Sequence, residues 1–274
     1  MERNVKILVA QHKEANVFQN DVYTPIHVGK SLSNKNLNIL GDDSGDNISS
    51  LNPAYCELTA QYWAWKNLDV EYIGLCHYRR YFEKEYTERN IEEELKGYDI
   101  ILSKRVVFRT NILTWLSQSL IPEDIALFHL YMSKQYKNNM QVYNSFYQER
   151  NWMNPANMFV CKKELFDDFC SWQFGILEKV RELLPISPYS RERRILGYLA
   201  EPFLSFYAYQ NKLKVKEVGV VSMIGDNYKC NLKTKLKEIK SNILFARRKS
   251  YYNISPASYV GLKLDGFIDK IDTL

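Results

Sequence analysis

Two clusters of cationic and hydrogen-bonding side chains follow short apolar runs of the sequence. The string QHK (residues 11–13) comes after KILVA, and the string HYRR (residues 77–80) comes after EYIGLC. In open α/β sheets, ligands collect at the carboxyl ends of strands, where these clusters are expected to lie. The adjacent guanidinium groups of Arg79 and Arg80 suit a phosphate or pyrophosphate. The alternative is that they pair with the acids of residues 83–94.

Carboxylates form a second group of candidates. The loop GDDSGDNIS (residues 41–49) carries three aspartates, which suit either turn formation or contacts with sugar or ribose hydroxyls. The loop lacks the acid at its twelfth position that a calcium loop requires. Farther along, Arg194 and Glu201 lie seven residues apart, two turns along one face of an expected helix. Both side chains are therefore predicted to face one cleft.

Common cofactor and metal motifs are absent from the sequence. No G-x-x-x-x-G-K-[ST], G-x-G-x-x-G or G-x-S-x-G string occurs, which argues against P-loop, Rossmann-cofactor and esterase sites. The string H-E-x-x-H and clustered Cys/His ligands are missing too. The five cysteines are scattered and odd in number, which is typical of reduced thiols in a cytosolic protein. We therefore expect no cofactor from the motifs.

The hydropathy pattern predicts the elements that position these candidates. Strands are expected at residues 6–10, 71–76, 99–102, 157–160 and 218–221. Helices are expected at residues 54–67 (with Asn52 as N-cap), 88–96, 165–183 and 191–209, and within residues 111–150. Strands that alternate with helices predict an α/β fold with a mostly parallel central sheet flanked by helices.

The composition is that of an ordinary globular chain. Of the 274 residues, 46% are hydrophobic and 25% are charged, and no apolar run approaches the roughly 18 residues of a membrane-spanning helix. The first residues lack the apolar core and cleavage site of a signal peptide. We expect a cytoplasmic protein with one domain over residues 1–225 and an extension over residues 226–274.

Positive charge is concentrated in the expected extension. Residues 229–249 contain eight Lys or Arg and one Glu, a formal charge of +7, so the rest of the chain sums to −2. Apolar residues recur at helical spacing through the same window. A basic amphipathic helix suits an anionic membrane surface, and the alternative is an ordinary solvated helix face. Nucleic acid is not an expected partner, because no nucleic-acid-binding motif accompanies the charge.

Several strings together resemble one bacterial family. They occur in the order KILVAQHK, PIHVG, GDDSGDNIS, YCELTAQYWAWKN, YIGLCHYRRYF, NPANMFV and RILGYLAEPF, from about residue 6 to residue 221. These strings are similar to the signatures of the domain-of-unknown-function family 4422, found in capsule, exopolysaccharide and O-antigen loci. The resemblance implies a GT-A-like glycosyltransferase that transfers galactofuranose or galactopyranose from a UDP-sugar.

The resemblance also implies site residues. The donor nucleotide-sugar is expected to contact Gln11, His12, Asp42, Asp43, Asp46, Asn47, His77, Arg79 and Arg80. For His12 alone, a satisfied semi-buried histidine is the alternative. Asn157 and Met158 are implied to face the donor sugar and the acceptor, and Glu201 matches an acid of the family. Arg194 joins the expected donor site through its spacing from Glu201.

The sequence also departs from the family. Pro202 follows Glu201 where Arg is usual, and Gln173 interrupts what is usually a Leu-Phe pair. GT-A enzymes normally carry an Asp-x-Asp metal motif where this chain has HYRR. We expect arginine and histidine to replace Mg²⁺ or Mn²⁺ in neutralising the UDP leaving group. The alternative is that the aspartates of residues 41–49 bind the metal.

The combined expectation is a glycosyltransferase bound peripherally to the inner face of the cell membrane, where it extends a lipid-linked (polyprenyl) glycan. Arg79, Arg80 and His77 are expected to stabilise the departing UDP. Glu201 or a loop carboxylate such as Asp46 is expected to act as general base if the reaction inverts. The alternative function is a non-catalytic UDP-sugar- or glycan-binding module of a polysaccharide synthase complex.

Overall fold

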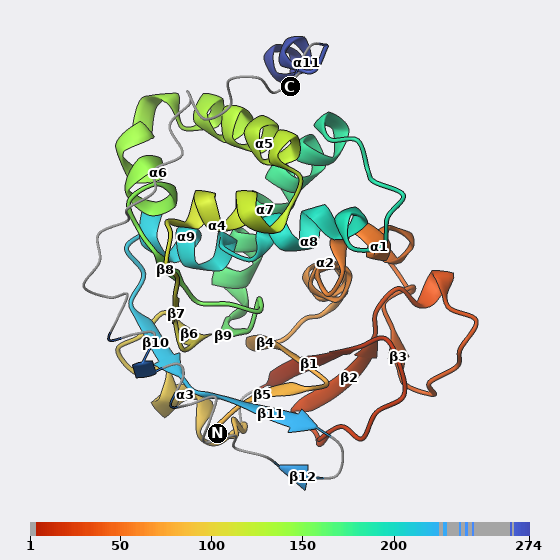
Figure 1. Ribbon diagram of the computed structural model, residues 1–274. Coiled ribbons are helices and arrows are strands. Elements are labelled where there is room, and N and C mark those ends of the chain that lie inside the picture. The colour runs from red at the N-terminus through yellow and green to blue at the C-terminus, as the bar shows by residue number, and fades with distance from the viewer. Residues whose placement is uncertain are drawn as a thin grey trace.

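A mixed β-sheet runs through the centre of the molecule (Figure 1). The computed structural model describes residues 4–224, 227–228, 236, 239–240, 243, 264 and 266–274. Within them the main strands lie in the order β10 (Val215–Val218), β6 (Ile100–Ser103), β9 (Phe159–Lys162), β4 (Tyr72–His77), β1 (Val5–Gln11), β2 (Tyr23–His27) and β3 (Leu40–Gly41). All neighbouring pairs are parallel except those of β9, which is antiparallel to β4 and β6. The expected α/β class and mostly parallel sheet are confirmed, and the orientation of β9 was not foreseen.

A hairpin extends β4 at its carboxyl end. His77 pairs with Arg80, the first residue of β5 (Arg80–Phe82), so Tyr78 and Arg79 occupy the turn. Strand β11 (Val220–Ile224) is antiparallel to β5 and also pairs with β12 (Asn227–Tyr228). The single strand expected at 218–221 is therefore two strands that meet at Gly219. At Gly219 the chain stops pairing with β6 and begins to pair with β5. The Glu83 amide donates to the Gly219 carbonyl at 2.8 Å.

Most helices cover one face of the sheet (Figure 1). They are α1 (Asn52–Tyr55), α2 (Leu58–Asn67), α4 (Ile112–Ser119), α5 (Pro122–Gln135), α6 (Met140–Tyr147), α7 (Lys163–Leu183), α8 (Ile195–Ala200) and α9 (Phe203–Gln210). The short helix α3 (Ile91–Glu94) packs on the other face. Single 3-10 turns lie at η1 (Lys30–Leu32), η2 (Ser49–Leu51), η3 (Lys137–Asn139) and η4 (Glu192–Arg194), and β7 (Val106–Val107) pairs with β8 (Trp152–Met153). The expected helices at 165–183 and within 111–150 are confirmed.

Two expected helices are interrupted. The helix expected from Ala54 to Asn67 stops at Cys56, whose φ of 55° is incompatible with a right-handed helix. Asn52 lies inside α1 and is not an N-cap; its Nδ2 donates to the Cys56 carbonyl at 2.7 Å. The helix expected at 191–209 breaks between α8 and α9, where Pro202 has no amide hydrogen to continue the α8 ladder. The helix expected at 88–96 is only α3.

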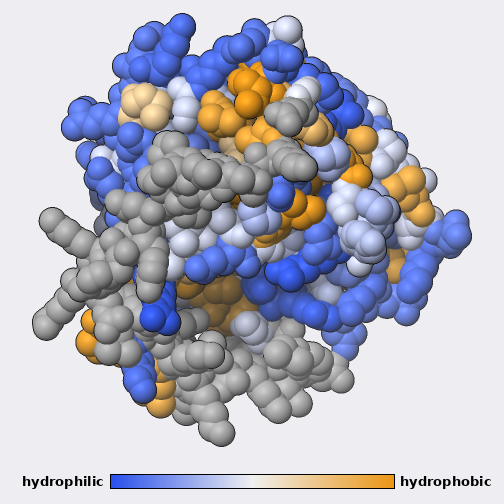
Figure 2. Space-filling view, turned by 45° about the horizontal axis from the view of Figure 1, so that its top comes forward, coloured by the Kyte–Doolittle hydropathy of each residue, from blue (hydrophilic) through white to orange (hydrophobic). Residues whose placement is uncertain are grey.

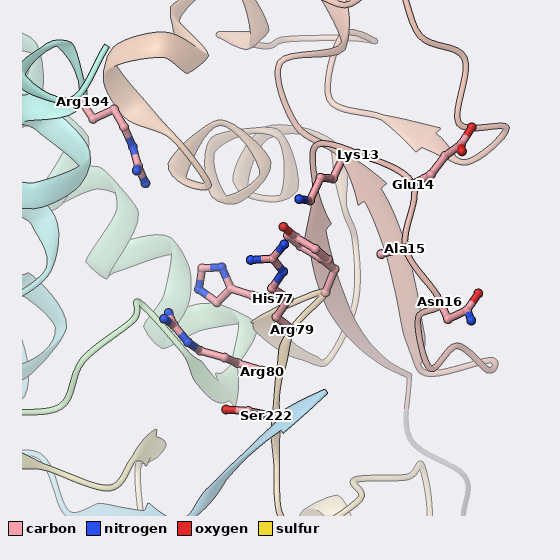
Figure 3. A pocket seen from close by; sticks show the side chains of 10 residues that line it. Lys13, Glu14, Ala15, Asn16, His77, Arg79, Arg80, Arg194 and Ser222 are labelled. Atoms are coloured by element: carbon pink, nitrogen blue, oxygen red, sulfur yellow. The ribbon is translucent and has the colours of Figure 1, made fainter. Parts of the chain in front are cut away.

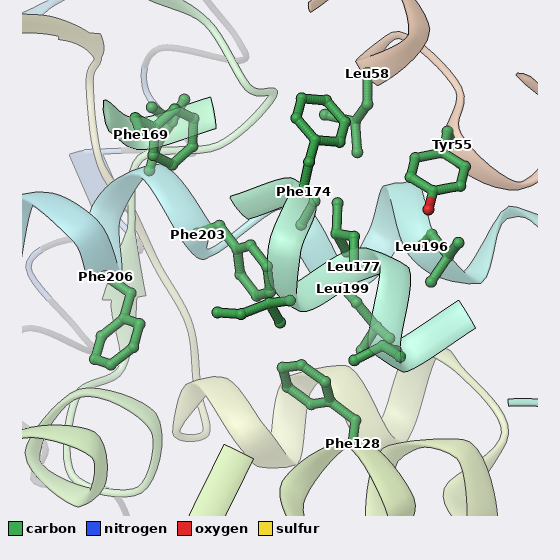
Figure 4. Packing of buried hydrophobic residues seen from close by; sticks show 14 of the residues in the cluster. Tyr55, Leu58, Phe128, Phe169, Phe174, Leu177, Leu196, Leu199, Phe203 and Phe206 are labelled. Carbon is green, nitrogen blue, oxygen red and sulfur yellow. The ribbon is translucent and has the colours of Figure 1, made fainter. Parts of the chain in front are cut away.

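The core has one layer on each face of the sheet, because successive side chains of a strand point to opposite faces. In β1, Leu8 and Ala10 face the helical layer, and Ile7 and Val9 face the other side. Figure 4 shows the helical layer, where Phe128, Phe174, Leu177, Leu199 and Phe203 interdigitate. This layer fixes the positions of α2 and α8, the helices whose ends reach the candidate site.

The surface seen over the helical half is mainly hydrophilic, with scattered hydrophobic residues among the charged ones (Figure 2). Among the described residues, no helix combines the length and apolarity needed to cross a bilayer. The last helix, α11 (Ile268–Thr273), lies against α5, where Lys134 Nζ donates to the Ile271 carbonyl.

Most of the expected basic extension lies outside the described residues. Within residues 229–249, Leu236, Ile239, Lys240 and Ile243 are described, all four are helical, and their side chains are exposed. The spacing of Leu236, Ile239 and Ile243 places them on one helix face, as the amphipathic pattern predicts. The expected boundary between residues 225 and 226 stays a prediction.

Candidate active site

A cationic pocket of about 780 Å³ opens at the carboxyl ends of β1 and β4. The residues that line it are Lys13, Glu14, Ala15, Asn16, His77, Tyr78, Arg79, Arg80, Arg194 and Ser222. Figure 3 shows the Arg80 side chain and the Arg194 side chain entering from different sides, and Glu14 pointing away from the centre. Of the two predicted clusters, Lys13 and residues 77–80 therefore lie around one pocket, whereas Gln11 and His12 are not among its lining residues.

Within the described residues, the cations of the pocket form no ion pair. In the described part of the chain, no carboxylate lies within 4.0 Å of the charged nitrogens of Lys13, Arg79, Arg80 or Arg194. The alternative that Arg79 and Arg80 pair with the acids of residues 83–94 is wrong, because none of these acids lies within that distance of either guanidinium group; Glu94, for example, binds Lys84 and Lys216. Several unneutralised cations around one cavity are arranged for a polyanionic ligand.

The two histidines of the site have different environments. His77 donates from Nε2 to the Ala156 carbonyl at 2.6 Å, so its Nδ1 is the nitrogen left for other partners. His12 lies edge-on to the Tyr78 ring at 5.4 Å between centroids. Partial burial, with Lys13 and Arg79 nearby, lowers the pKa of His12, so it is neutral at pH 7 and adds no charge to the pocket.

Two carboxyl groups are held by one turn beside this pocket. The Ala156 amide donates to Glu201 Oε2 at 2.7 Å, and Asn157 Nδ2 donates to Glu57 Oε1 at 2.9 Å. Ala156 and Asn157 have φ values of 74° and 49°, a left-handed conformation that is uncommon for residues other than glycine. Because the next residues enter β9, the sheet itself fixes this turn.

The protonation of Glu201 is set by this arrangement. Burial, and then the nearby negative charge of Glu57, raise the pKa of Glu201 to about 7, against the opposing effects of the Ala156 amide, Arg80 and Arg194. A carboxyl group with such a pKa exchanges its proton near neutral pH, which suits general acid–base chemistry. Glu57 and Glu201 are both half-buried, so the pair is not sealed inside the core.

Arg194 and Glu201 approach each other although their helix is interrupted. Arg194 ends η4 and Glu201 follows α8 directly, with α8 between them. Arg194 lines the pocket, and its charge lowers the pKa of Glu201. The Nε–H of Arg194 donates to Cys56 Sγ at 3.1 Å, which ties the guanidinium to the break between α1 and α2. Glu201 is not among the residues that line the pocket, so the expectation that both side chains face one cleft stays a prediction.

The aspartate loop is built differently from the expectation. Asp42 is fully buried, and its carboxylate accepts hydrogen bonds from the Gly29 amide at 2.8 Å, the Lys30 amide at 3.0 Å and the Ser49 hydroxyl. This corrects the expectation that Asp42 contacts the donor, because its oxygens already hold the loop together. Asn47 accepts from the Ser49 amide and donates to the Gly45 carbonyl, which closes a turn, but its side chain is only partly buried and it stays a predicted donor contact.

Asp46 lies away from the pocket. Its carboxylate accepts from the Tyr62 hydroxyl at 3.3 Å, and its backbone amide donates to Asn67 Oδ1, at the end of α2 that is far from Glu57. A ten-residue helix is roughly 15 Å long, so Asp46 is not placed to act on the same substrate atom as Glu201. This corrects its assignment as a candidate base.

The three loop aspartates have three different surroundings. Asp42 is enclosed, Asp43 is exposed and Asp46 is bound to α2. Among the described residues, no group of three or more His, Cys, Asp or Glu side chains is arranged to hold an ion. Mg²⁺ is often held by only one or two carboxylates together with substrate phosphates, so metal binding by this loop stays the alternative prediction. Asp43 stays a predicted donor contact.

The comparisons with known proteins agree with this geometry. The family model described as a domain of unknown function (DUF4422) matches residues 6–212. The chain belongs to this family. A solved structure titled "WbbM bifunctional glycosytransferase apo structure" is 29% identical in sequence, with a TM-score of 0.70. The match covers 83% of this chain and 46% of that chain, so this chain spans about half of its length. No curated protein matches the chain.

Two residues that the DUF4422 resemblance places in contact with the donor, Met158 and Gln11, are buried. Met158 is 1% exposed and packs in the core layer on the face of the sheet opposite the main helices, which corrects its assignment to the donor site. Gln11 is buried, and its Nε2 donates to the Lys13 carbonyl at 2.8 Å, so it shapes the loop that carries Lys13. Gln11 Oε1 has no hydrogen-bond partner in the described structure and stays a predicted contact.

Sequence reasoning missed Glu57. It lies within the family string YCELTAQYWAWKN, but a single acid ahead of an apolar helix resembles an ordinary residue of the first helical turn. Its partner Asn157 is 100 residues away, and only the fold shows that they meet. Asn157 Oδ1 is buried without a hydrogen-bond partner in the described structure, so Asn157 keeps its predicted place in the site.

Proposed function

We propose that this DUF4422 protein is a glycosyltransferase that moves a galactosyl unit, galactofuranose or galactopyranose, from a UDP-sugar to a lipid-linked glycan. The observation that carries the proposal is the combination of cations without acidic partners and a carboxyl group with a pKa of about 7 at one site. The first part suits the diphosphate of a nucleotide-sugar, and the second suits the hydroxyl of an acceptor.

The cations have a defined task in this reaction. Negative charge builds on the diphosphate as the bond to the anomeric carbon breaks, and fixed positive groups lower the energy of that state. Arg79 and Arg80 sit at the β4–β5 hairpin, whose backbone is fixed by strand pairing, so little reorganisation is needed. Arg194 and Lys13 approach the same cavity from other elements. We propose that these groups stabilise the negative charge on the leaving diphosphate, as a divalent metal does in other transferases.

The carboxyl pair has the complementary task. The acceptor oxygen forms a bond to the anomeric carbon, the bond from that carbon to the diphosphate oxygen breaks, and its electron pair leaves with UDP. The proton of the acceptor hydroxyl passes to the carboxylate of Glu201 in an inverting reaction. The left-handed turn at Ala156 and Asn157 holds Glu201 in place for this transfer.

The finer assignments draw on the family resemblance and on the charge pattern. The galactosyl donor and the setting in capsule, exopolysaccharide or O-antigen synthesis follow from the family resemblance. The solved relative is titled a bifunctional glycosyltransferase, and this chain matches about half of it. A polyprenyl-linked acceptor gives the basic window at residues 229–249 a purpose, because it keeps the enzyme at the inner, anionic membrane surface.

The test is release of UDP from a panel of UDP-sugars that includes UDP-galactofuranose and UDP-galactose. Each donor is offered with and without a short lipid-linked acceptor, and with EDTA or Mn²⁺ in parallel. We expect turnover with one galactosyl donor that depends on acceptor and survives EDTA. Turnover lost in EDTA would overturn the assignment of the leaving-group charge to arginine. Tight UDP binding without turnover on any acceptor would favour the alternative binding module.

A further inference from the structure

One two-residue turn connects the Glu57 and Glu201 carboxyl groups. The Ala156 amide donates to Glu201, and the side-chain amide of the next residue, Asn157, donates to Glu57. Each contact fixes one carboxyl group relative to a single short piece of backbone. The separation of the two groups is therefore set by the turn and not by flexible side chains. The negative charge of Glu57 acts on Glu201 at this fixed separation.

The other charged groups around Glu201 come from different elements. Arg80 approaches from β5 and Arg194 from η4, and both favour the ionised form of Glu201. Cys56 lies at the break before α2, where burial raises the pKa of its thiol to about 11, so it is neutral. His77 contacts the carbonyl of Ala156, on the same turn. Among these neighbours, Glu57 is the group whose charge opposes ionisation of Glu201.

We propose that Glu57 is a positioning residue that makes Glu201 a stronger base for the acceptor hydroxyl. This inference rests on the proposed transferase function. A carboxylate held next to a second negative charge binds a proton more tightly, so Glu201 takes the acceptor proton more readily. Glu57 gains and loses no proton in the step: the proton moves from the acceptor oxygen to Glu201, and the electron pair leaves with UDP.

The deciding variant is Glu57→Gln. Glutamine keeps a carbonyl oxygen that accepts from Asn157 Nδ2, so the hydrogen bond to the turn survives while the charge is removed. We expect the acid limb of the kcat profile to move to lower pH by about one unit. On the alkaline plateau kcat falls about threefold because the base is weaker, and near pH 5 the variant is faster than the wild type. Damage to folding cannot produce such a crossing.

The matched control is Glu178→Gln, which removes an exposed carboxylate of α7 outside the site. Its pH profile is expected to overlay the wild-type profile. If kcat of Glu57→Gln is lowered by the same factor at every pH and the acid limb does not move, Glu57 has only a structural role. An equal shift in Glu178→Gln would show that the effect is one of overall charge. Either result overturns the proposal.

A measurement without turnover separates this inference from the proposed function. Infrared difference titration follows the protonated-carboxyl band of Glu201, identified by its loss in Glu201→Gln. We expect this band to titrate at lower pH in Glu57→Gln than in the wild type. A shift without transferase activity would support the coupled pair and contradict the proposed function. Activity without a shift in either measurement would support the function and contradict the role of Glu57.

Discussion

The protonation of one carboxyl group governs what this site can do at physiological pH. Glu201 changes its charge near pH 7, because burial and Glu57 oppose its ionisation more strongly than the nearby arginines favour it. The sign follows directly: below this pH Glu201 is protonated and cannot accept a proton, and above it Glu201 is ionised. Activity that needs Glu201 as a base therefore rises through neutral pH and falls as the pH is lowered.

Glu201→Gln tests this role. We expect kcat to fall by about 10²–10⁴-fold and the acid limb of the profile to disappear, because glutamine cannot accept the proton. The KM for the UDP-sugar is expected to change little. The measurement is steady-state UDP release between pH 5 and pH 9. A variant that keeps the wild-type kcat and acid limb would show that another group is the base.

Arg79→Ala and Arg80→Ala test the leaving-group assignment. Each variant removes one guanidinium from the pocket proposed to hold the diphosphate, and we expect a loss of about 10²–10³-fold in kcat/KM. The control is Arg193→Ala, which removes an exposed arginine next to Arg194 that does not line the pocket. Initial rates at several donor concentrations separate kcat from KM. Full activity in Arg79→Ala would contradict the assignment.

At the scale of single residues, the sequence predicted the positions of the cationic side chains better than those of the acidic ones. HYRR follows a recognisable apolar strand, so its place at the end of that strand is a local property. The role of Asp42 also depends on nearby residues. Composition does not reveal that its carboxylate accepts hydrogen bonds from the Gly29 and Lys30 amides. The contact of Glu57 with Asn157 joins distant parts of the chain, and no spacing rule indicates it.

Among the elements, β9 approaches the backbone of β4 closely at Gly74. A Cβ added at Gly74 would lie 2.8 Å from the Phe159 carbonyl oxygen and 3.0 Å from side-chain atoms of Ile7 and Val160. The backbone atom cannot move aside without disturbing the sheet. This close packing puts the turn at Ala156 and Asn157 next to His77 at the end of β4.

Gly74→Ala is expected to lower the free energy of unfolding by about 1–3 kcal/mol, because the added methyl overpacks the sheet. The matched control is Gly175→Ala in α7, where nothing lies within 4 Å of the added Cβ. It is expected to raise the free energy of unfolding by about 0.5–1 kcal/mol through helix propensity. Urea denaturation measures both. Equal stability of the two variants would contradict this account of β9.

The existence of most elements was predictable, and their interruptions were less so. The apolar stripe of α7 and the run of β1 carry strong local signals. The break at Cys56 depends on the positive φ of a residue that is neither Gly nor Asn, and no propensity indicates it. Likewise, the composition of β9 indicates a buried strand, but its direction depends on the path of the chain before and after it.

At the scale of the molecule, the cationic pocket and the carboxyl pair lie at one end of the sheet, and the basic window (residues 229–249) follows the sheet in the sequence. The predicted α/β fold follows from the alternation of strands and helices along the sequence. The placement of residues 229–249 against a membrane does not follow from it, because burial patterns report contacts within the chain and not with a lipid surface. That placement stays a prediction from charge.

Replacement of Lys233, Lys235, Lys237 and Lys240 by Gln tests this prediction. Each basic residue near an anionic bilayer contributes about 1 kcal/mol, so binding to vesicles is expected to weaken at least tenfold. Co-sedimentation with vesicles of anionic or neutral lipid measures it. Four lysines replaced outside this window (Lys84, Lys96, Lys104 and Lys179) form the control, which is expected to bind as the wild type does. Equal binding to both lipids would rule out an electrostatic anchor.

The turn at Ala156 and Asn157 also limits how this protein can be altered. It contacts His77, which lines the cationic pocket, and it holds both carboxyl groups. Under the proposed function, a substitution in the turn is therefore expected to disturb departure of the nucleotide and removal of the proton together. Donor preference is better changed at residues of the pocket wall that make none of these contacts, such as Asn16 and Ser222. Libraries for new sugar donors belong at those positions, with the turn left intact.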